Sequence, residues 1–206
     1  MENGKWKIKG RRMRTSNKVR KTLETEVKIE LNIDGTGKRE ISTPIKFFTH
    51  MLEQFAAHGS FDLKIDVQSH DKDNHHVIED VAITLGDAFK EALGDKKGIT
   101  RYGSFILPMD EALSLAVIDL SGRAFSKVDI EIKDEKTSDF ETVLLPHFFN
   151  SFAQASLSTI HVKMLDGSDT HHIIEAVFKS FARALRIACS TDETKKDIIT
   201  STKGLL

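Results

Sequence analysis

Apolar and polar residues alternate in two stretches near the start of the chain. In residues 24–34 every second residue from Val27 to Ile33 is apolar, and residues 61–67 repeat the alternation. Successive side chains of a strand point to opposite faces of a sheet, so this period of two predicts half-buried β-strands. An Asp-Gly pair ending at Gly35 favours a hairpin turn after the first strand.

Two other stretches carry apolar residues at spacings of three and four. One lies between the two predicted strands and runs from Phe48 to Ala56, and the other runs from Val77 to Leu93. This spacing places the apolar side chains on one face of a helix. Gly94 stands where a glycine is expected to end the second helix.

The second half of the chain repeats this order. DNHHVIED from Asp73 and DTHHIIEA from Asp169 share the pattern Asp-x-His-His-x-Ile-Glu, 96 residues apart. Upstream, His50 precedes the first histidine pair by 25 residues, and His147 precedes the second by 24. The repeat therefore predicts further elements. They are strands at 111–122 and 160–165 and helices at 148–157 and 173–188.

Strands and helices that do not alternate strictly indicate an α+β fold. We expect an internally duplicated chain with two ββαβα-type halves, each a four-stranded sheet backed by two helices. The two halves are expected to pack helix face to helix face. The expected divisions are a basic N-terminal arm at 1–18, a first half at 19–105, and a second half at 106–206 that includes a C-terminal tail.

The composition is that of a globular protein. The 206 residues carry a net charge of -1, and 39% of them are hydrophobic and 30% charged. These values argue against wholesale disorder and give no general reason to expect nucleic-acid binding. No apolar run approaches the length of a membrane span, and the N-terminus lacks the apolar core of a secretory signal. A single cysteine, Cys189, excludes an intrachain disulfide and favours a reducing compartment, the cytoplasm.

Nine basic residues lie before residue 22, and we interpret this segment as a solvated arm. Contact with RNA or a membrane surface is the alternative interpretation. The solvated arm is preferred because no aromatic platform or amphipathic stripe accompanies the charge. We expect neither a nucleic-acid nor a membrane partner.

Histidine is the unusual component, because four of the nine histidines form two adjacent pairs. If each motif begins a helix, His75 and Glu79 lie one turn apart, whereas His75 and His76 point in different directions. Adjacent histidines would then serve two metal ions more naturally than one. The candidate metal ligands are His50, His75, His76, Glu79, His147, His171, His172 and Glu175.

A lone histidine pair is more often a surface or core feature than a metal site. Two matched pairs, each followed by Glu and preceded by His at nearly equal distance, favour a metal site instead. Imidazole and carboxylate ligands without thiolate suit Mn, Fe, Co, Ni or Zn. We expect six-coordinate Mn(II), because the ligand supply is generous and positions for substrate must stay open. Zinc binds a given nitrogen site more tightly and would compete.

Six linked blocks are similar to a known family in order and spacing. They are FFTHMLEQFAAHGSFDL, DNHHVIEDVAITLGDAF, RYGSFILPMDEAL, IDLSGR, THHIIEAVFKSFARALR and the terminal STKGLL. Together they closely resemble the imidazoleglycerol-phosphate dehydratase family, from about Arg20 to Leu206. The resemblance implies a hydro-lyase of histidine biosynthesis that converts D-erythro-imidazole-glycerol phosphate into imidazole-acetol phosphate and water.

The same resemblance implies two Mn(II) ions per active site and a homo-oligomer of twenty-four subunits built from trimers. Active sites are expected to be completed across subunit contacts. The family's metal ligands fall on the eight candidates named above. Its substrate-binding positions fall on Glu24, His50, Gln54, Arg101, Arg123, Ser201, Thr202 and Lys203.

Our hypothesis for the chemistry is that two ions hold the substrate ring as an imidazolate, which expels hydroxide from the neighbouring carbon. Glu24 is the candidate general base, while Glu79 and Glu175 act in the catalytic centre as metal ligands. Arg101 and Arg123 suit a phosphate through fork-like donors. Two alternatives stay open: a metal-dependent hydrolase, and a non-catalytic metal-binding or shell-forming protein.

Overall fold

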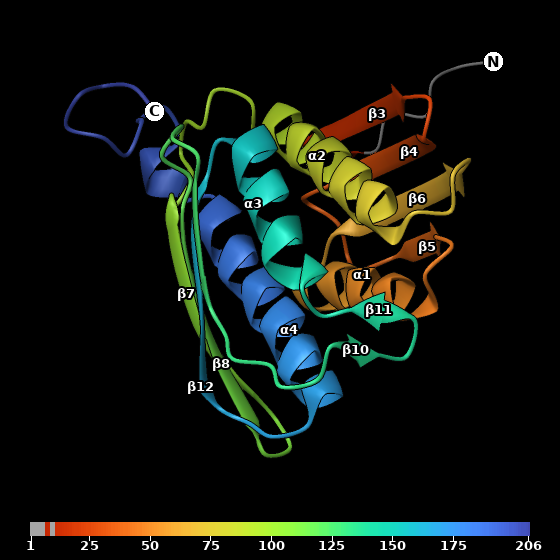
Figure 1. The fold of residues 1–206 in the computed structure, drawn as a ribbon. Coiled ribbons are helices and arrows are strands. Elements are labelled where there is room, and N and C mark those ends of the chain that lie inside the picture. The colour runs from red at the N-terminus through yellow and green to blue at the C-terminus, as the bar shows by residue number, and fades with distance from the viewer. Residues whose placement is uncertain (1–6, 9–10) are drawn as a thin grey trace.

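Two four-stranded sheets enclose four helices in the computed structural model, which describes residues 7–8 and 11–206 (Figure 1). The first sheet has the order β3-β4-β6-β5. Its strands are β3 (Thr15–Lys21), β4 (Thr25–Asn32), β5 (Arg39–Ser42) and β6 (Asp62–Ser69). Apolar residues at alternate positions of β4 and β6 are buried against the helices, as the period of two predicts.

The second sheet has the equivalent order β7-β8-β12-β9. Its strands are β7 (Tyr102–Met109), β8 (Ala112–Asp119), β9 (Phe125–Asp129) and β12 (Thr159–Asp166). In each sheet the fourth strand, β5 or β9, is short and pairs in parallel with its neighbour. These two strands are the elements that the ββαβα pattern lacked, and they complete the predicted four-stranded sheets.

The helices are α1 (Lys46–Gly59), α2 (Asn74–Leu93), α3 (Leu144–Ser156) and α4 (Thr170–Cys189). They exchange partners between the two halves, because α1 packs against α4 and α2 packs against α3. Fully buried phenylalanines join the layers: the Phe55 ring on α1 stacks 5.7 Å from that of Phe181 on α4. Each such ring contributes roughly 1.5–3 kcal/mol by leaving water. The two halves therefore share one core.

Gly86 allows α2 and α3 to approach closely. A Cβ atom at this position would lie 2.8 Å from the carbonyl oxygen of Phe152 and 2.8 Å from the Cβ of Ala155, both on α3. Only glycine fits at this helix contact without moving a backbone. The separation between α2 and α3 is thus set by the absence of a side chain.

The predicted α+β class and the duplicated, helix-to-helix arrangement are confirmed. The strands do not follow the expected divisions of the chain. β3 begins at Thr15, inside the arm expected at 1–18. The expected boundary between residues 105 and 106 falls within β7, all of which pairs with β8. Residues 1–6 and 9–10 of the arm lie outside the described residues. Within the arm, β1 (Lys7–Ile8) pairs with β2 (Arg11–Arg12).

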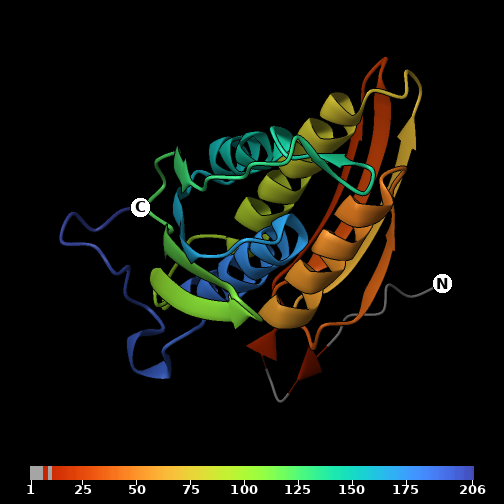
Figure 2. The same cartoon turned by 60° about the horizontal axis from the view of Figure 1, so that its bottom comes forward.

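Three short elements complete the description: β10 (Lys136–Thr137), β11 (Phe140–Glu141) and the 3-10 helix η1 (Glu193–Lys195). The segment after α4 lies beside the second sheet, on the side away from the first (Figures 1 and 2). Among the described residues, no helix has the length and apolar character needed to cross a membrane.

Candidate functional site

Each His-His pair lies in the first turn of a helix, where an aspartate fixes the start. Asp73 caps α2 and accepts the backbone N–H of His75 at 2.8 Å, and Asp169 caps α4 and accepts that of His172 at 3.0 Å. Adjacent residues on a helix point in directions about 100° apart. The side chains of the two histidines in each pair therefore point to different parts of the structure.

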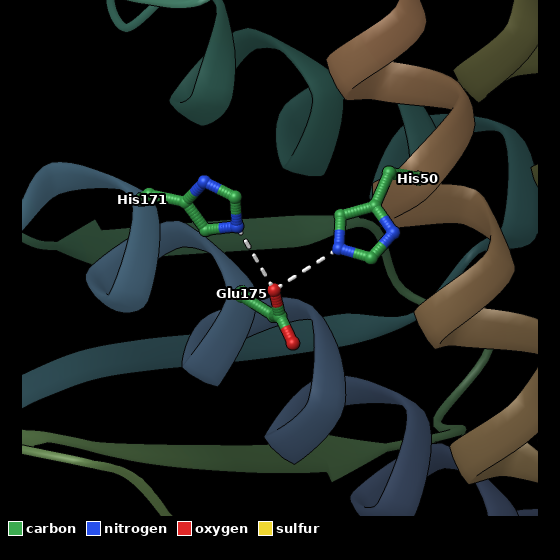
Figure 3. A group of neighbouring side chains, drawn as sticks. All are labelled: His50, His171 and Glu175. Carbon is green, nitrogen blue, oxygen red and sulfur yellow. Dashed lines mark hydrogen bonds and ion pairs between the residues drawn. The ribbon is translucent and has the colours of Figure 1, made fainter.

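The first cluster consists of His50 on α1 with His171 and Glu175 on α4 (Figure 3). The Nε2 atoms of both histidines lie 3.1 Å from the same oxygen, Glu175 Oε2. The other oxygen of Glu175 accepts from Lys179 Nζ at 2.6 Å. Burial opposes ionisation of Glu175, but the hydrogen bonds from Lys179 and His50 outweigh it and lower its pKa. Gln54 approaches the far ring nitrogen of His50 at 3.4 Å.

The second cluster is the counterpart of the first and joins His75 and Glu79 on α2 to His147 on α3. The rings of His75 and His147 stack with centroids 4.3 Å apart, and His147 Nε2 lies 3.4 Å from Glu79 Oε1. His147 Nε2 is buried and has no hydrogen-bond partner. A buried polar nitrogen that makes no hydrogen bond is costly, and a bound cation would remove that cost.

Both clusters suit a divalent transition metal. In each, one atom from each of the three side chains lies within 4.8 Å of the others. Two imidazoles and one carboxylate match the preferences of Mn, Fe, Co, Ni and Zn, and three ligands leave coordination positions open. Each cluster draws on both halves of the chain, because α1 pairs with α4 and α2 with α3.

His76 and His172, the remaining members of the pairs, lie outside these two clusters. His76 Nδ1 is 2.6 Å from Asp71 Oδ2, and its Nε2 is 3.6 Å from Glu24 Oε1. His172 Nδ1 is 2.7 Å from Glu111 Oε2. Hydrogen bonds to these carboxylates raise the pKa of both histidines, and His172 is the main reason why the pKa of Glu111 falls to about 2.

Arg101 lies at the opposite end of α4 from the first cluster. Its backbone N–H donates to the carbonyl of Ala188 at 2.8 Å. Its guanidinium donates to both carboxylate oxygens of Asp119, at 2.8 and 3.1 Å, and to the carbonyl of Thr200 at 2.7 Å. The Asp119 pair raises the pKa of Arg101. With a rise of 1.5 Å per residue, Glu175 and Ala188 are separated by about 20 Å along the helix.

The C-terminal tail runs from Arg101 towards Arg123. Gly98 N–H donates to the carbonyl of Ile198, and a Cβ atom added at Gly122 would lie 2.7 Å from the carbonyl carbon of Leu206. Arg123 is exposed beside Gly122, and the Ser201–Lys203 segment lies in the tail between these anchors. The proposed phosphate-binding residues thus gather in one region, far from the clusters of the same chain.

Lys179, Asp71 and Glu111 make polar contacts with the candidate ligands and were not assigned from the sequence. Lys179 lies one turn after Glu175 on α4, a spacing that the sequence displays. Asp71 and Glu111 reach their histidines from separate loops, and no spacing rule links them. The tertiary fold alone reveals these two contacts.

Comparison with known proteins agrees with these observations. The family model for imidazoleglycerol-phosphate dehydratase matches residues 43–185. Enzymes of that name from Koribacter versatilis and Acetivibrio thermocellus are 49% and 52% identical to this chain; the alignments cover 94% and 91% of it and 100% and 96% of those proteins.

Solved structures agree as well. Imidazoleglycerol-phosphate dehydratase from Staphylococcus aureus superposes with a TM-score of 0.79 at 36% identity, covering 86% of this chain and 99% of that one. The Pyrococcus furiosus IGPD structure gives a TM-score of 0.80 at 38% identity, covering 92% of this chain and 100% of the other. With two duplicated His-His-Glu helices and a match over most of its length, the chain belongs to the imidazoleglycerol-phosphate dehydratase family.

Proposed function

We propose that this protein is a hydro-lyase of histidine biosynthesis that removes water from imidazole-glycerol phosphate to give imidazole-acetol phosphate. The observation that carries the proposal is the pair of matched clusters, each of two histidines and one glutamate from two packed helices. They occur in a chain similar to dehydratases along nearly its whole length. A substrate imidazole offers two ring nitrogens, which suit two metal ions.

Two Mn(II) ions per active site are the proposed cofactor. The donor set supports a metal of this class, and the buried His147 Nε2, which makes no hydrogen bond, supports a bound cation. Bound ions would supply positive charge beside the substrate ring and hold it in place. His50, His75, Glu79, His147, His171 and Glu175 would hold the ions in the two clusters, with His76 and His172 as the remaining ligands.

We further propose that subunits complete one another's active sites, in an assembly of twenty-four chains built from trimers in the cytoplasm. Support comes from the distance of about 20 Å along α4 between the first cluster and the Arg101 region. A substrate of a few carbon atoms cannot bridge that distance within one chain. His76 and His172, turned away from their own clusters, are suited to the cluster of a neighbouring chain.

In the proposed chemistry, Glu24 takes the proton from the carbon that bears a hydroxyl group. Hydroxide leaves the adjacent carbon next to the ring, and the resulting enol becomes the ketone. Glu24 is suited to this role because its carboxylate is half exposed and 3.6 Å from His76 Nε2. Arg101, Arg123 and Ser201, Thr202 and Lys203 of the tail would bind the phosphate.

The test combines metal removal with substitution of Glu24. Chelated protein should lose turnover and regain it with Mn(II), measured as formation of imidazole-acetol phosphate. Glu24→Gln should lower kcat by roughly 100- to 10,000-fold while metal content stays unchanged. Glu30→Gln, at an exposed position on β4, the strand that begins directly after Glu24, is the matched control. Full turnover by Glu24→Gln with its metal retained would remove Glu24 from the mechanism, and turnover in excess chelator would remove the metal.

A further inference from the structure

Asp71 and Glu111 contact their surroundings in the same unusual way. In each, one carboxylate oxygen contacts a histidine ring. The other accepts a hydrogen bond from the backbone N–H of the residue just before the helix that carries that histidine. Asp71 Oδ2 lies 2.6 Å from His76 Nδ1, while its Oδ1 accepts the N–H of Asp73 at 3.0 Å. Glu111 Oε2 lies 2.7 Å from His172 Nδ1, while its Oε1 accepts the N–H of Asp169 at 2.8 Å.

The two backbone contacts are equivalent in the duplication. Asp73 and Asp169 are the residues that cap α2 and α4, and they precede their histidine pairs by the same number of residues. Each carboxylate therefore ties the start of a helix to the ring of a histidine in its first turn. This shared geometry fixes both the position and the rotation of the ring.

The carboxylates themselves come from non-equivalent positions. The residue that corresponds to Asp71 in the second half is Gly167, where a Cβ atom would lie 2.9 Å from Ile173 Cγ1. Glycine offers no carboxylate, and Glu111 in the turn between β7 and β8 takes the place of Asp71. Glu111 in turn corresponds to Glu24, since each leads the second strand of its half. The two halves thus reach one geometry with different residues.

The contact decides which ring nitrogen is available to a cation. A neutral imidazole carries one proton, and a carboxylate at Nδ1 accepts a hydrogen bond only if that proton is on Nδ1. The lone pair of Nε2 is then free, and the ring is held in the orientation that presents it. The side chains of His76 and His172 are both partly exposed, and the nearest carboxylate oxygens to their Nε2 atoms lie at 3.6 Å (Glu24) and 3.8 Å (Asp110).

We propose that Asp71 and Glu111 are positioning residues that hold His76 and His172 as Nε2 metal ligands. The inference rests on the proposed metal-dependent function. The same contact bears on the candidate general base, Glu24. Because Asp71 contacts Nδ1 of His76, Glu24 is not needed to orient that ring, whereas its counterpart Glu111 orients His172. Glu24 instead stands near Nε2 at 3.6 Å, on the side where the metal and substrate would bind.

The experiment uses Asp71→Asn and Glu111→Gln in the full-length protein. The controls are Glu131→Gln, at an exposed position, and Asp66→Asn, at a half-buried position on the outer face of β6. The amides keep an oxygen for the backbone N–H but can donate to Nδ1, which favours the opposite tautomer. The first readout is the ring-nitrogen NMR shift of metal-free protein, at a pH where the histidines are neutral. The second is Mn(II) affinity measured by titration.

In wild type and controls, the rings of His76 and His172 should carry the proton on Nδ1. In Asp71→Asn the His76 signal, and in Glu111→Gln the His172 signal, should move towards the other tautomer, with Mn(II) bound roughly 10- to 100-fold more weakly. Asp71→Glu should restore part of the affinity. Unchanged tautomers or unchanged affinity in the amide variants would overturn the positioning role. If wild type itself neither binds Mn(II) nor turns over, the proposed function fails, while the tautomer measurement still reports on Asp71 and Glu111.

Discussion

Replacing Gly86 with alanine tests whether the contact between α2 and α3 sets the geometry of the second cluster. The new Cβ would lie 2.8 Å from Phe152 O and from Ala155 Cβ. Ordinary contact needs roughly 0.6 Å more. One of the two atoms belongs to the α3 backbone, so rotation of a side chain does not relieve the clash and α3 itself must move. His147 on the same helix would move away from Glu79.

Two opposing free-energy changes determine the stability of Gly86→Ala. Alanine gains about 1 kcal/mol of helix propensity over glycine. Overpacking of a tight contact costs about 1–3 kcal/mol. The net effect is a free energy of unfolding lowered by about 0–2 kcal/mol. The effect on the metal should be clearer, because ligand distances tolerate only about 0.2 Å of error. We expect at least a roughly tenfold loss of Mn(II) affinity at the second cluster.

The assay is a calorimetric Mn(II) titration, combined with urea unfolding. In Gly86→Ala one class of site should weaken while the other, built on α1 and α4, keeps its affinity. The matched control is Ala182→Gly, the position on α4 that is 96 residues later and buried. It loses about 1–2 kcal/mol through helix propensity and a buried methyl group but pushes no helix away. Its metal affinities should stay unchanged.

Gly86→Ala with unchanged metal affinity and stability raised by about 1 kcal/mol would refute the reasoning. That result would mean that the propensity gain meets no opposing clash. An equal loss of Mn(II) affinity in Ala182→Gly would also contradict the role of the Gly86 contact, because general destabilisation would then explain both variants.

Three further predictions concern buried or paired groups. Burial raises the pKa of the Cys189 thiol to about 11, so iodoacetamide should modify it roughly 100-fold more slowly in the folded chain than in urea; equal rates would contradict its burial. The pKa of Glu111 is about 2 instead of 4.5, so its stabilising contribution is full above pH 4.5 and lost as the pH falls towards 2. The free energy of unfolding, measured with urea, should therefore decrease less steeply between pH 4.5 and 2 for Glu111→Gln than for wild type. Equal slopes for the two proteins would refute the lowered pKa of Glu111. Asp80 is buried and accepts from Arg20, Thr22 and Thr25, so Asp80→Ala should lower the free energy of unfolding by about 2–3 kcal/mol, whereas Asp87→Ala, at a half-exposed side chain, should change it little. Equal effects of the two substitutions in denaturant unfolding would contradict the role of the buried carboxylate.

The sequence by itself determined the elements and the duplication. The alternation in residues 24–34 and the three-and-four spacing after Val77 depend only on which face of a strand or helix a residue occupies, and that is a local property. The same local geometry correctly separated His75 from His76 and paired His171 with Glu175 one turn later. A motif that occurs twice in one chain also indicated two equivalent halves before any contact was known.

The tertiary structure alone decided which helices share a cluster and which carboxylates contact His76 and His172. His50 meets His171 because the apolar faces of α1 and α4 pack together, and no spacing along the chain encodes that choice of partner. Asp71 and Glu111 reach their rings from unrelated loops, because the second half has Gly167, which offers no carboxylate, at the position that corresponds to Asp71. The close approach at Gly86 likewise exists only in the packed helices. Local periodicity fixes the direction of a side chain relative to its own element, whereas contacts between elements depend on how all the apolar faces are buried together.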